Sequence, residues 1–467
     1  YFSNRFQVTS AYYQLIGIPG RNLFHNYIRR LISEDRPYNT FVTELITATG
    51  DTHRLAPGNF LMRGVQQGDP IQDTWDTLVN EITTQFLGVQ TQCVSCHDGR
   101  RHLEPINLYL SVRRREEFMR LSAFMSRMQI TEVNVDAFNQ QRKGIISDLS
   151  TGAYHGIVSP QNPGSRPARI GTFEPQYMFT GEEPTSGAWR RELARIIVND
   201  RQFARATVNY LWVHFFRSGI VDPPTGWDMA RLDPKNPPPA PWSIQPTHPA
   251  LIEALADEFI RGGYRLRPII RLMAQSAAYQ LSSRYDGAWK PDYDLYFAKH
   301  TPRRLSAEEA YDALATATMT ETPMFVEGFD QPLERAVQLP DPTEPRFTDS
   351  VRNLLTNLGR GDWWRLPPRN EGSVVLSLYL MNDSNVNQRT FGLQRGQQNS
   401  STRVASLLAT AITDDEAIRQ LFLATLGRQP SDAEMAVALR NRRPNREDWF
   451  TDIQWSLINK TEFMFNH

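Results

Sequence analysis

The chain has 467 residues, of which 40% are hydrophobic, and its 51 lysines and arginines balance its 51 aspartates and glutamates. This size and composition predict a globular protein of about two or three domains, and the zero net charge excludes a global field that would draw it to nucleic acid or to an anionic membrane. No run approaches the roughly 18 consecutive apolar residues of a membrane-spanning helix, so the sequence predicts none.

Two amphipathic helices are the first predicted elements, within residues 22–50, and Asp35-Arg36-Pro37 joins them. Apolar residues recur there every three or four positions, which is the spacing of one helical face. The same spacing predicts a third helix over residues 74–92. The apolar positions are Phe24, Tyr27, Ile28 and Leu31 in the first helix, Phe41, Leu45 and Ile46 in the second, and Trp75, Leu78, Ile82 and Phe86 in the third.

The motif Cys-Val-Ser-Cys-His at residues 93–97 follows and contains both cysteines of the chain. Two thiols one helical turn apart, followed at once by a histidine, are the pattern for covalent attachment of haem. The thiols bond to vinyl groups of the porphyrin, and the histidine ligates the iron. We therefore predict a single covalent haem c, with Cys93 and Cys96 forming the thioethers and His97 as the proximal iron ligand.

Two other kinds of site contain Cys-x-x-Cys, namely a redox pair of thioredoxin type and half of a zinc site. The thioredoxin type follows a βαβ pattern, whereas this motif follows a predicted helix. Zinc would need two further thiolates or imidazoles, and the only nearby candidate is His102. Haem is the favoured interpretation.

Residues 112–130 predict a further helix, which offers methionines as the sixth, distal iron ligand. Met125 or Met128 is our candidate, and an axial methionine would raise the reduction potential relative to a second histidine. Ordinary core packing is the alternative for either methionine. His155 is a weaker candidate, and His102 is too close in sequence to the proximal histidine to reach the opposite side of the porphyrin. The apolar residues that would share one face of the helix are Phe118, Leu121, Met125 and Met128.

Arginines cluster in sequence around the motif. These arginines could pair with haem propionates or form a docking patch for a partner. The alternative is an ordinary solvated helix face whose charge is balanced by neighbouring glutamates. The cluster consists of Arg100, Arg101, Arg113, Arg114 and Arg115.

Residues 150–187 are rich in Gly, Pro, Ser and Thr, which indicates a domain boundary. We predict a cytochrome-like haem c domain over residues 1–165 and a companion domain over residues 166–467. Helices resume at Trp189, and a Pro-rich stretch at residues 232–249 predicts an ordered arm packed by Trp242. Later helix starts carry the residue pairs of capping boxes: Ser306 with Glu309, Thr413 with Glu416, and Ser431 with Glu434.

Strand signals are sparse, so the predicted fold class is mainly α. We expect a helical, haem-c-bearing N-terminal domain, followed by a larger helical C-terminal domain with long, Pro-rich, ordered loops.

The order of these motifs resembles the two-part planctomycete cytochrome-like family, which is found in several bacterial phyla and whose halves are domains of unknown function. The resemblance runs from about residue 22 to the last residue. After the haem motif the family commonly has His-x-Phe-Asp-Pro, whereas this sequence has Gly-Arg-Arg-His-Leu-Glu-Pro, which places it in a variant branch. The resemblance implies haem and an exported location but no established activity. The similar segments include FLGVQTQCVSCHDGRRHLEPINLYLS, WRRELARIIVNDRQFARATVNYLWVHFFRSGIVDP and PTHPALIEALADEF.

The first functional hypothesis is a monohaem c-type cytochrome that carries single electrons to or from a partner redox protein. We expect it to dock on a membrane respiratory or photosynthetic reaction-centre complex, and to be a carrier more than a stand-alone enzyme. The alternative is a cell-surface binding or polymer-processing protein with a structural, sensory or peroxidatic haem. Its support is aromatic side chains that could stack on sugars: Trp227, Trp242, Trp363 and Trp364.

Covalent haem is attached outside the cytoplasmic membrane, so we expect a periplasmic or cell-surface protein, either free or membrane-associated. Tyr1 is no initiator. We therefore expect either a processed leader or a longer chain before it, and a signal peptide or an anchor could lie in that part.

Overall fold

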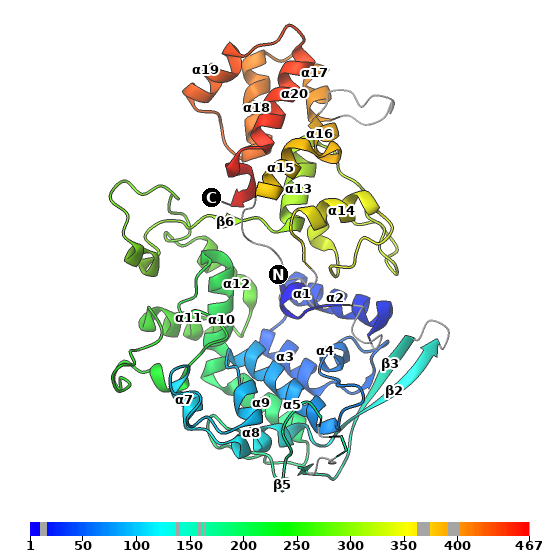
Figure 1. Cartoon of the computed structure of the whole chain (residues 1–467), viewed down its shortest axis with the longest axis vertical. Helices are drawn as coiled ribbons and strands as arrows, with labels where there is room; N and C mark the ends of the chain where they lie inside the picture. The colour runs from blue at the N-terminus through cyan, green and yellow to red at the C-terminus, as the bar shows by residue number, and fades with distance from the viewer. Residues whose placement is uncertain are drawn as a thin grey trace. The chain divides into compact units, whose positions relative to one another are not determined.

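The computed structural model describes residues 1–9, 16–136, 141–156, 161–162, 164–361, 374–390 and 402–466. Of these described residues, 51% are helical and 7% are in strands. The protein consists of two compact units, Tyr1–Thr301 and Pro302–His467 (Figure 1). The prediction of a mainly helical chain with two domains is confirmed, and each unit is described here by itself.

The first unit is built mainly of helices. Their bounds are α1 Phe2–Arg5, α2 Gly17–Ser33, α3 Tyr38–Thr47, α4 Gly58–Met62, α5 Ile71–Ile82, α6 Gln92–Cys96, α7 Leu108–Ser111, α8 Arg115–Ser122, α9 Trp189–Asn199, α10 Arg201–Phe216, α11 Pro249–Arg261 and α12 Leu266–Ala274. Shorter helical segments are η1 Thr83–Leu87, η2 Ala123–Met125, η3 Met229–Arg231 and η4 Pro291–Tyr296. The predicted pair of helices within residues 22–50 corresponds to α2 and α3.

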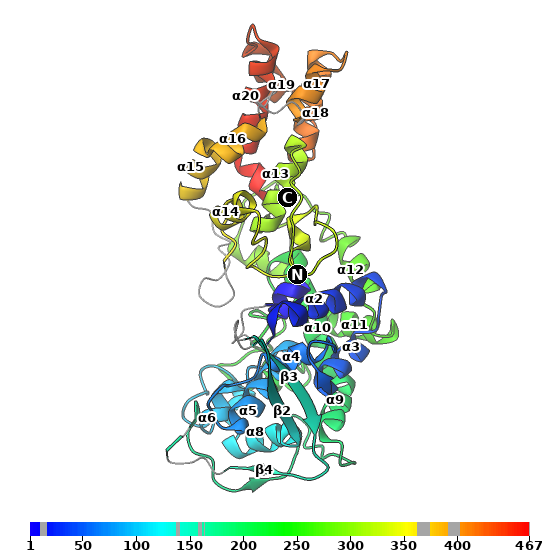
Figure 2. The same cartoon turned by 90° about the vertical axis from the view of Figure 1, so that its right-hand side faces the viewer.

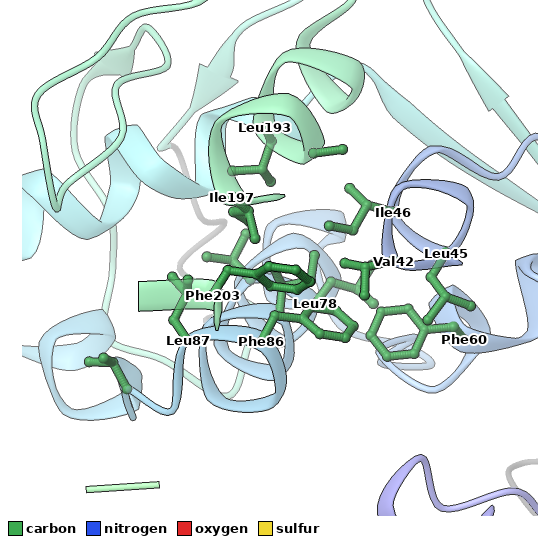
Figure 3. Close-up of a cluster of buried hydrophobic side chains, with 14 of the residues drawn as sticks. Val42, Leu45, Ile46, Phe60, Leu78, Phe86, Leu87, Leu193, Ile197 and Phe203 are labelled. Atoms are coloured by element: carbon green, nitrogen blue, oxygen red, sulfur yellow. The ribbon is translucent and has the colours of Figure 1, made fainter. Parts of the chain in front are cut away.

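Residues from both sides of the predicted boundary at residue 165 share one hydrophobic core. Helix α3 packs against α9, and Figure 3 shows Val42 and Leu78 in the same cluster as Leu193, Ile197 and Phe203. The compact units therefore divide at residue 301, not at residue 165. The boundary at 165 stays a prediction about family domains.

The predicted helix over residues 74–92 is α5 continued by the π-helical segment η1. Trp75, Leu78 and Ile82 are buried along one face, as their spacing predicts. The chain leaves η1 at Gly88 in the left-handed conformation, φ 71°. A Cβ there would overlap the ring of Trp227, so only glycine permits this tight exit toward the motif helix α6.

A three-stranded antiparallel sheet corrects one prediction. Its order is β1-β3-β2, with β1 Gly50–Asp51, β2 Met128–Asp136 and β3 Gln141–Asp148, and β2 and β3 form a long hairpin (Figure 2). The helix predicted over residues 112–130 corresponds to α8 and the 3-10 segment η2, and it is wrong beyond Met125, because Met128 begins β2. Residues 130–135 (ITEVNV) are rich in β-branched side chains, which favour the ladder with β3 over continued helix.

Two smaller antiparallel pairs complete the described strands. In the first unit β4 Tyr154–His155 pairs with β5 Thr172–Phe173, and in the second β6 Arg303–Arg304 pairs with β7 Phe465–Asn466. No helix of the described residues is long and apolar enough to cross a membrane.

The second unit is also helical, and its helix starts are set by local capping. Ser306 and Ser431 form the predicted capping boxes, and Thr413 caps its helix by accepting from the backbone N–H of Glu416. Its elements are α13 Ala307–Thr318, η5 Ala336–Gln338, α14 Asp349–Asn357, α15 Val374–Asn382, α16 Ser384–Thr390, α17 Arg403–Leu408, α18 Asp414–Leu426, α19 Asp432–Arg440, α20 Arg446–Ile458 and η6 Thr461–Met464.

Candidate functional site

The two cysteines lie on the short helix α6, and both thiols are free. Residues three apart on a helix share a face, so Cys93 and Cys96 point to the same side. Cys93 is exposed and Cys96 is partly exposed, whereas Val94 and Ser95 between them are 0% and 1% exposed. The motif therefore presents its thiols outward and is anchored by its two intervening residues.

His97 follows at the C-terminal end of α6 in extended conformation. Its Nδ1 lies 2.7 Å from the carbonyl oxygen of Asp98. A carbonyl only accepts, so Nδ1 carries the proton and the lone pair lies on Nε2. Among the described residues Nε2 has no hydrogen bond. This is the tautomer in which a metal-ligating imidazole is held by its other nitrogen.

The loop after the motif is closed by backbone contacts. The N–H of Gly99 donates to the carbonyl of Arg113 at 2.9 Å, and a carboxylate oxygen of Asp98 accepts from the N–H of Arg115 at 2.8 Å. The ring of His102 lies 4.4 Å, centroid to centroid, from that of His97. The loop thus folds back beside His97.

The arginine cluster divides into internal and outward-facing members. Arg113 pairs with Glu117 at 2.8 Å, and Arg115 donates to the carbonyl oxygens of Ser95, Pro167 and Ala168. The side chains of the other three are exposed and make no salt bridge within the described part of the chain: Arg100, Arg101 and Arg114.

A buried ionic network lies on the inner side of α6, and sequence reasoning missed it. Asp73 and Asp76 on α5 are 0% and 1% exposed, and the fully buried Arg169 donates from Nη2 to both, at 2.5 and 2.7 Å. Further donors to Asp76 are the hydroxyls of Ser122 at 2.6 Å and Tyr154 at 3.0 Å. Buried charges have to be paired and hydrogen-bonded, and these contacts satisfy both carboxylates.

The network also sets the protonation of its members. Burial alone would raise the pKa of Asp73, but the hydrogen bonds from Ser165 and Arg169 outweigh it and hold that pKa below its ordinary value. Burial would lower the pKa of Arg169, and Asp76 and Tyr154 outweigh burial and raise it. Both groups are therefore charged at neutral pH.

Neither predicted distal ligand lies on the surface that carries the thiols. Met125 and Met128 are both 0% exposed, on η2 and at the start of β2, so they do not share a helical face. The indole N–H of Trp75 donates to the carbonyl of Met128 at 3.2 Å. His155 is exposed on β4 and contacts Thr172. The identity of the distal ligand stays a prediction.

The structure bears on the two other interpretations of Cys-x-x-Cys. No group of three or more His, Cys, Asp or Glu among the described residues is placed to hold a metal ion, so a zinc site has no further ligands there. The named strands of the first unit all pair antiparallel, so within the described residues no βαβ unit leads to the motif. The residues present fit covalent haem better, with two free thiols on one face and an imidazole nitrogen ready to ligate.

Two family matches divide the chain. Residues 4–129 match PSCyt2, described as a protein of unknown function (DUF1549), and the Cys-x-x-Cys-His motif lies within this match. Residues 189–441 match PSD1, described as a protein of unknown function (DUF1553). No curated protein and no solved structure matches the chain significantly.

Proposed function

The chain belongs to the planctomycete cytochrome-like family, in which a PSCyt2 domain precedes a PSD1 domain, and from this premise we propose that it is an exported monohaem c-type cytochrome. It carries single electrons to or from a partner redox protein. The observation that carries the proposal is the outward-facing pair of free thiols followed by a histidine whose Nδ1 is already bonded.

Each residue of the motif has a defined role in this proposal. Cys93 and Cys96 bond to the haem when sulfur and hydrogen of each thiol add across a vinyl double bond, so that nothing is released. His97 ligates the iron through Nε2, because Asp98 holds Nδ1. The bound haem supplies an iron that accepts and returns one electron.

Its surroundings support docking of a partner. Arg100, Arg101 and Arg114 are exposed near the motif and are not neutralised by salt bridges among the described residues. Exposed arginines of this kind favour a partner with acidic side chains and speed the encounter of the two proteins. We propose that this partner belongs to a membrane respiratory or photosynthetic complex, and that the protein works in the periplasm or at the cell surface.

Intact mass under denaturing conditions tests haem attachment. The protein, produced with haem-attachment machinery, should exceed the mass of its polypeptide by one haem, and Cys93→Ser with Cys96→Ser should remove that excess. A wild-type mass equal to the bare chain would refute the proposal.

Visible spectra of two histidine variants test the proximal ligand. His97→Ala should keep the covalent haem but change the absorption of the reduced protein, because the iron loses its axial nitrogen. His102→Ala is the matched control, since its ring lies beside that of His97 but is assigned no bond to iron. Equal spectra for both variants would contradict the assignment.

The second candidate is a cell-surface binding or polymer-processing protein with a structural, sensory or peroxidatic haem, and one observation favours it. Met125 and Met128 are fully buried while the motif faces outward, which supports an iron without a methionine ligand. Of the aromatic side chains that suggested a sugar-binding surface, Trp227 is fully buried and Trp363 and Trp364 lie outside the described residues.

Carbon monoxide separates the two functions. If the reduced wild-type protein does not bind carbon monoxide, both axial positions of the iron are filled, as we expect for an electron carrier. Rapid binding of carbon monoxide favours the second candidate. Met125→Ala and Met128→Ala are tested in the same way. Loss of the six-coordinate spectrum in only one of them would identify that methionine as the distal ligand.

A further inference from the structure

A short segment between the two family matches lies against both the motif helix and α5. It comprises residues 164–169 (Gly-Ser-Arg-Pro-Ala-Arg), and we call it the strap. Arg166 of the strap donates from Nε to the hydroxyl of Ser95 at 3.2 Å, and Ser95 donates in turn to the carbonyl of Gln92 at 2.6 Å. The strap therefore contacts the motif at the buried residue just before Cys96.

A second arginine also joins the strap to the motif. Arg115, the first residue of α8, donates from Nε to the carbonyl oxygen of Ser95 at 3.1 Å. The two nitrogens at the end of the same side chain donate to the carbonyls of Pro167 and Ala168, at 2.5 and 2.8 Å. Ser95 is thus bonded through its hydroxyl by Arg166 and through its backbone by Arg115.

The strap is itself fixed on α5 by the buried network. Arg169 pairs with Asp73 and Asp76, and the backbone N–H and hydroxyl of Ser165 donate to Asp73 at 2.5 and 2.8 Å. Gly164 has φ +71°, and a Cβ there would overlap the carboxylate of Asp73. The strap thus approaches α5 closely enough to need glycine, and separating its buried ions would leave charges unpaired.

Strand β4 precedes the strap in the sequence, strand β5 follows it, and the two strands pair with each other. They pair antiparallel, and beside them the N–H of Gly156 donates to the carbonyl of Gly171 at 2.8 Å. Tyr154 on β4 also donates to Asp76. The strap is therefore held at both ends, and Figure 2 shows α5, α6, α8 and β4 gathered in one part of the first unit.

We propose that the strap is a positioning element of the haem site, which fixes α6 from its buried side before haem is attached and keeps both thiols facing outward. Arg166 and Arg115 are the positioning residues, and Arg169 anchors the strap to α5. The inference rests on the proposed function, because haem attachment is what gives a fixed orientation of the thiols its use. It extends the haem site beyond the PSCyt2 match, which ends at residue 129.

Hydrogen exchange of the full chain without haem tests the hold of the strap on α6. Ser95→Ala removes the acceptor of Arg166, and Arg166→Gln removes the guanidinium whose Nε donates to it. Each should speed exchange of the α6 amides about tenfold. Arg166 also contacts Asp73, Thr77 and Asp76, and Ser95 also donates to Gln92, so each variant removes more than the shared contact. The effect of the double variant should therefore be smaller than the sum of the two single effects, because the contact between Ser95 and Arg166 is lost in either of them. Peptides from α10 and α11 provide the reference that the first unit is still folded.

Ser126→Ala is the matched control for Ser95→Ala. Ser126 is also buried and also donates to the carbonyl three residues before it, Ala123, at 2.8 Å, but it does not contact the strap. It should leave the exchange of α6 unchanged. Exchange of α6 that is unaffected by Ser95→Ala and Arg166→Gln, or affected equally by Ser126→Ala, would overturn the proposal.

The haem-loaded protein gives the functional half of the test. Ser95→Ala and Arg166→Gln should lower the fraction of chains that carry covalent haem and shift the midpoint potential, while Ser126→Ala should change neither. A wild-type protein without haem would refute the proposed function, and the exchange measurement would still decide whether the strap holds α6. Variants with faster exchange but normal haem loading and potential would refute the positioning role alone.

Discussion

Two ionic clusters of similar composition lie in contrasting surroundings. In the first unit Arg169, Asp73 and Asp76 have side chains that are 0%, 0% and 1% exposed. In the second unit Arg428 bonds to Glu434 and Glu462, and these side chains are 36%, 23% and 21% exposed. The contacts are of equal quality, because Arg428 lies within 2.8 Å of Glu434 and 2.5 Å of Glu462.

The comparison shows that burial and not contact distance decides what such a cluster does. A buried charge that loses its partner cannot be solvated, so the first cluster works as a unit and fixes the chain segments that supply it. Water replaces a lost partner in the second cluster, so its pairs mainly reinforce a helix start that Ser431 already caps. Only the first cluster is suited to holding the strap and the motif in place.

Among the substitutions that test the difference between the two clusters, Arg169→Met should lower stability most. It leaves Asp73 and Asp76 buried without their cation, and we expect a loss of about 3 to 5 kcal/mol in the free energy of unfolding of the first unit. Chemical denaturation of the haem-free chain, followed by hydrogen exchange in each unit, measures the loss. A loss below about 1 kcal/mol would mean that the carboxylates are solvated or neutral.

Gly164→Ala tests whether the close approach of the strap to α5 contributes to stability, without changing any charge. The left-handed backbone alone costs an added Cβ about 1 to 2 kcal/mol, and overlap with Asp73 adds to it. Gly181→Ala is the matched control, because Gly181 also has positive φ but nothing lies within 4 Å of its Cβ position. We expect Gly164→Ala to destabilise the first unit more than Gly181→Ala, and equal losses would contradict the close approach.

Arg428→Met makes the corresponding change in the second unit. The fork of Arg428 contacts both Glu434 and Glu462, but all three side chains reach solvent, so we expect a loss of about 1 kcal/mol. Denaturation followed by exchange of the α19 and α20 peptides measures it. A loss as large as that of Arg169→Met would show that exposure does not separate the two clusters.

Salt concentration should give the smallest difference. Raising ionic strength from about 0.01 M to 1 M shortens the screening length from roughly 30 to 3 Å, which weakens exposed pairs and leaves buried ones nearly unaffected. We expect a loss of a few tenths of a kcal/mol from the pairs of Arg428 and none from those of Arg169. The free energies of unfolding of the wild type, Arg428→Met and Arg169→Met are measured at both salt concentrations. A thermodynamic cycle then separates the salt dependence of these ion pairs from general salt effects.

Much of this protein follows from its sequence because the signals are local. The spacing of Phe24 and Ile28 predicts α2, and Ser306 and Ser431 predict helix starts through contacts three residues away. The haem prediction likewise depends on five consecutive residues, whose thiols and imidazole need only one turn of helix to be brought together. A short segment contains all that these features require.

Only the tertiary structure decided the features whose partners are far apart in the chain. The helix predicted through Met128 gives way to β2, because pairing with β3 competes with helical spacing. The buried network joins Arg169 to Asp73 and Asp76 across 96 and 93 positions. Many arginines and carboxylates in the sequence could pair, and which of them meet away from water depends on how the helices pack, since burial and not residue type makes the pairing obligatory.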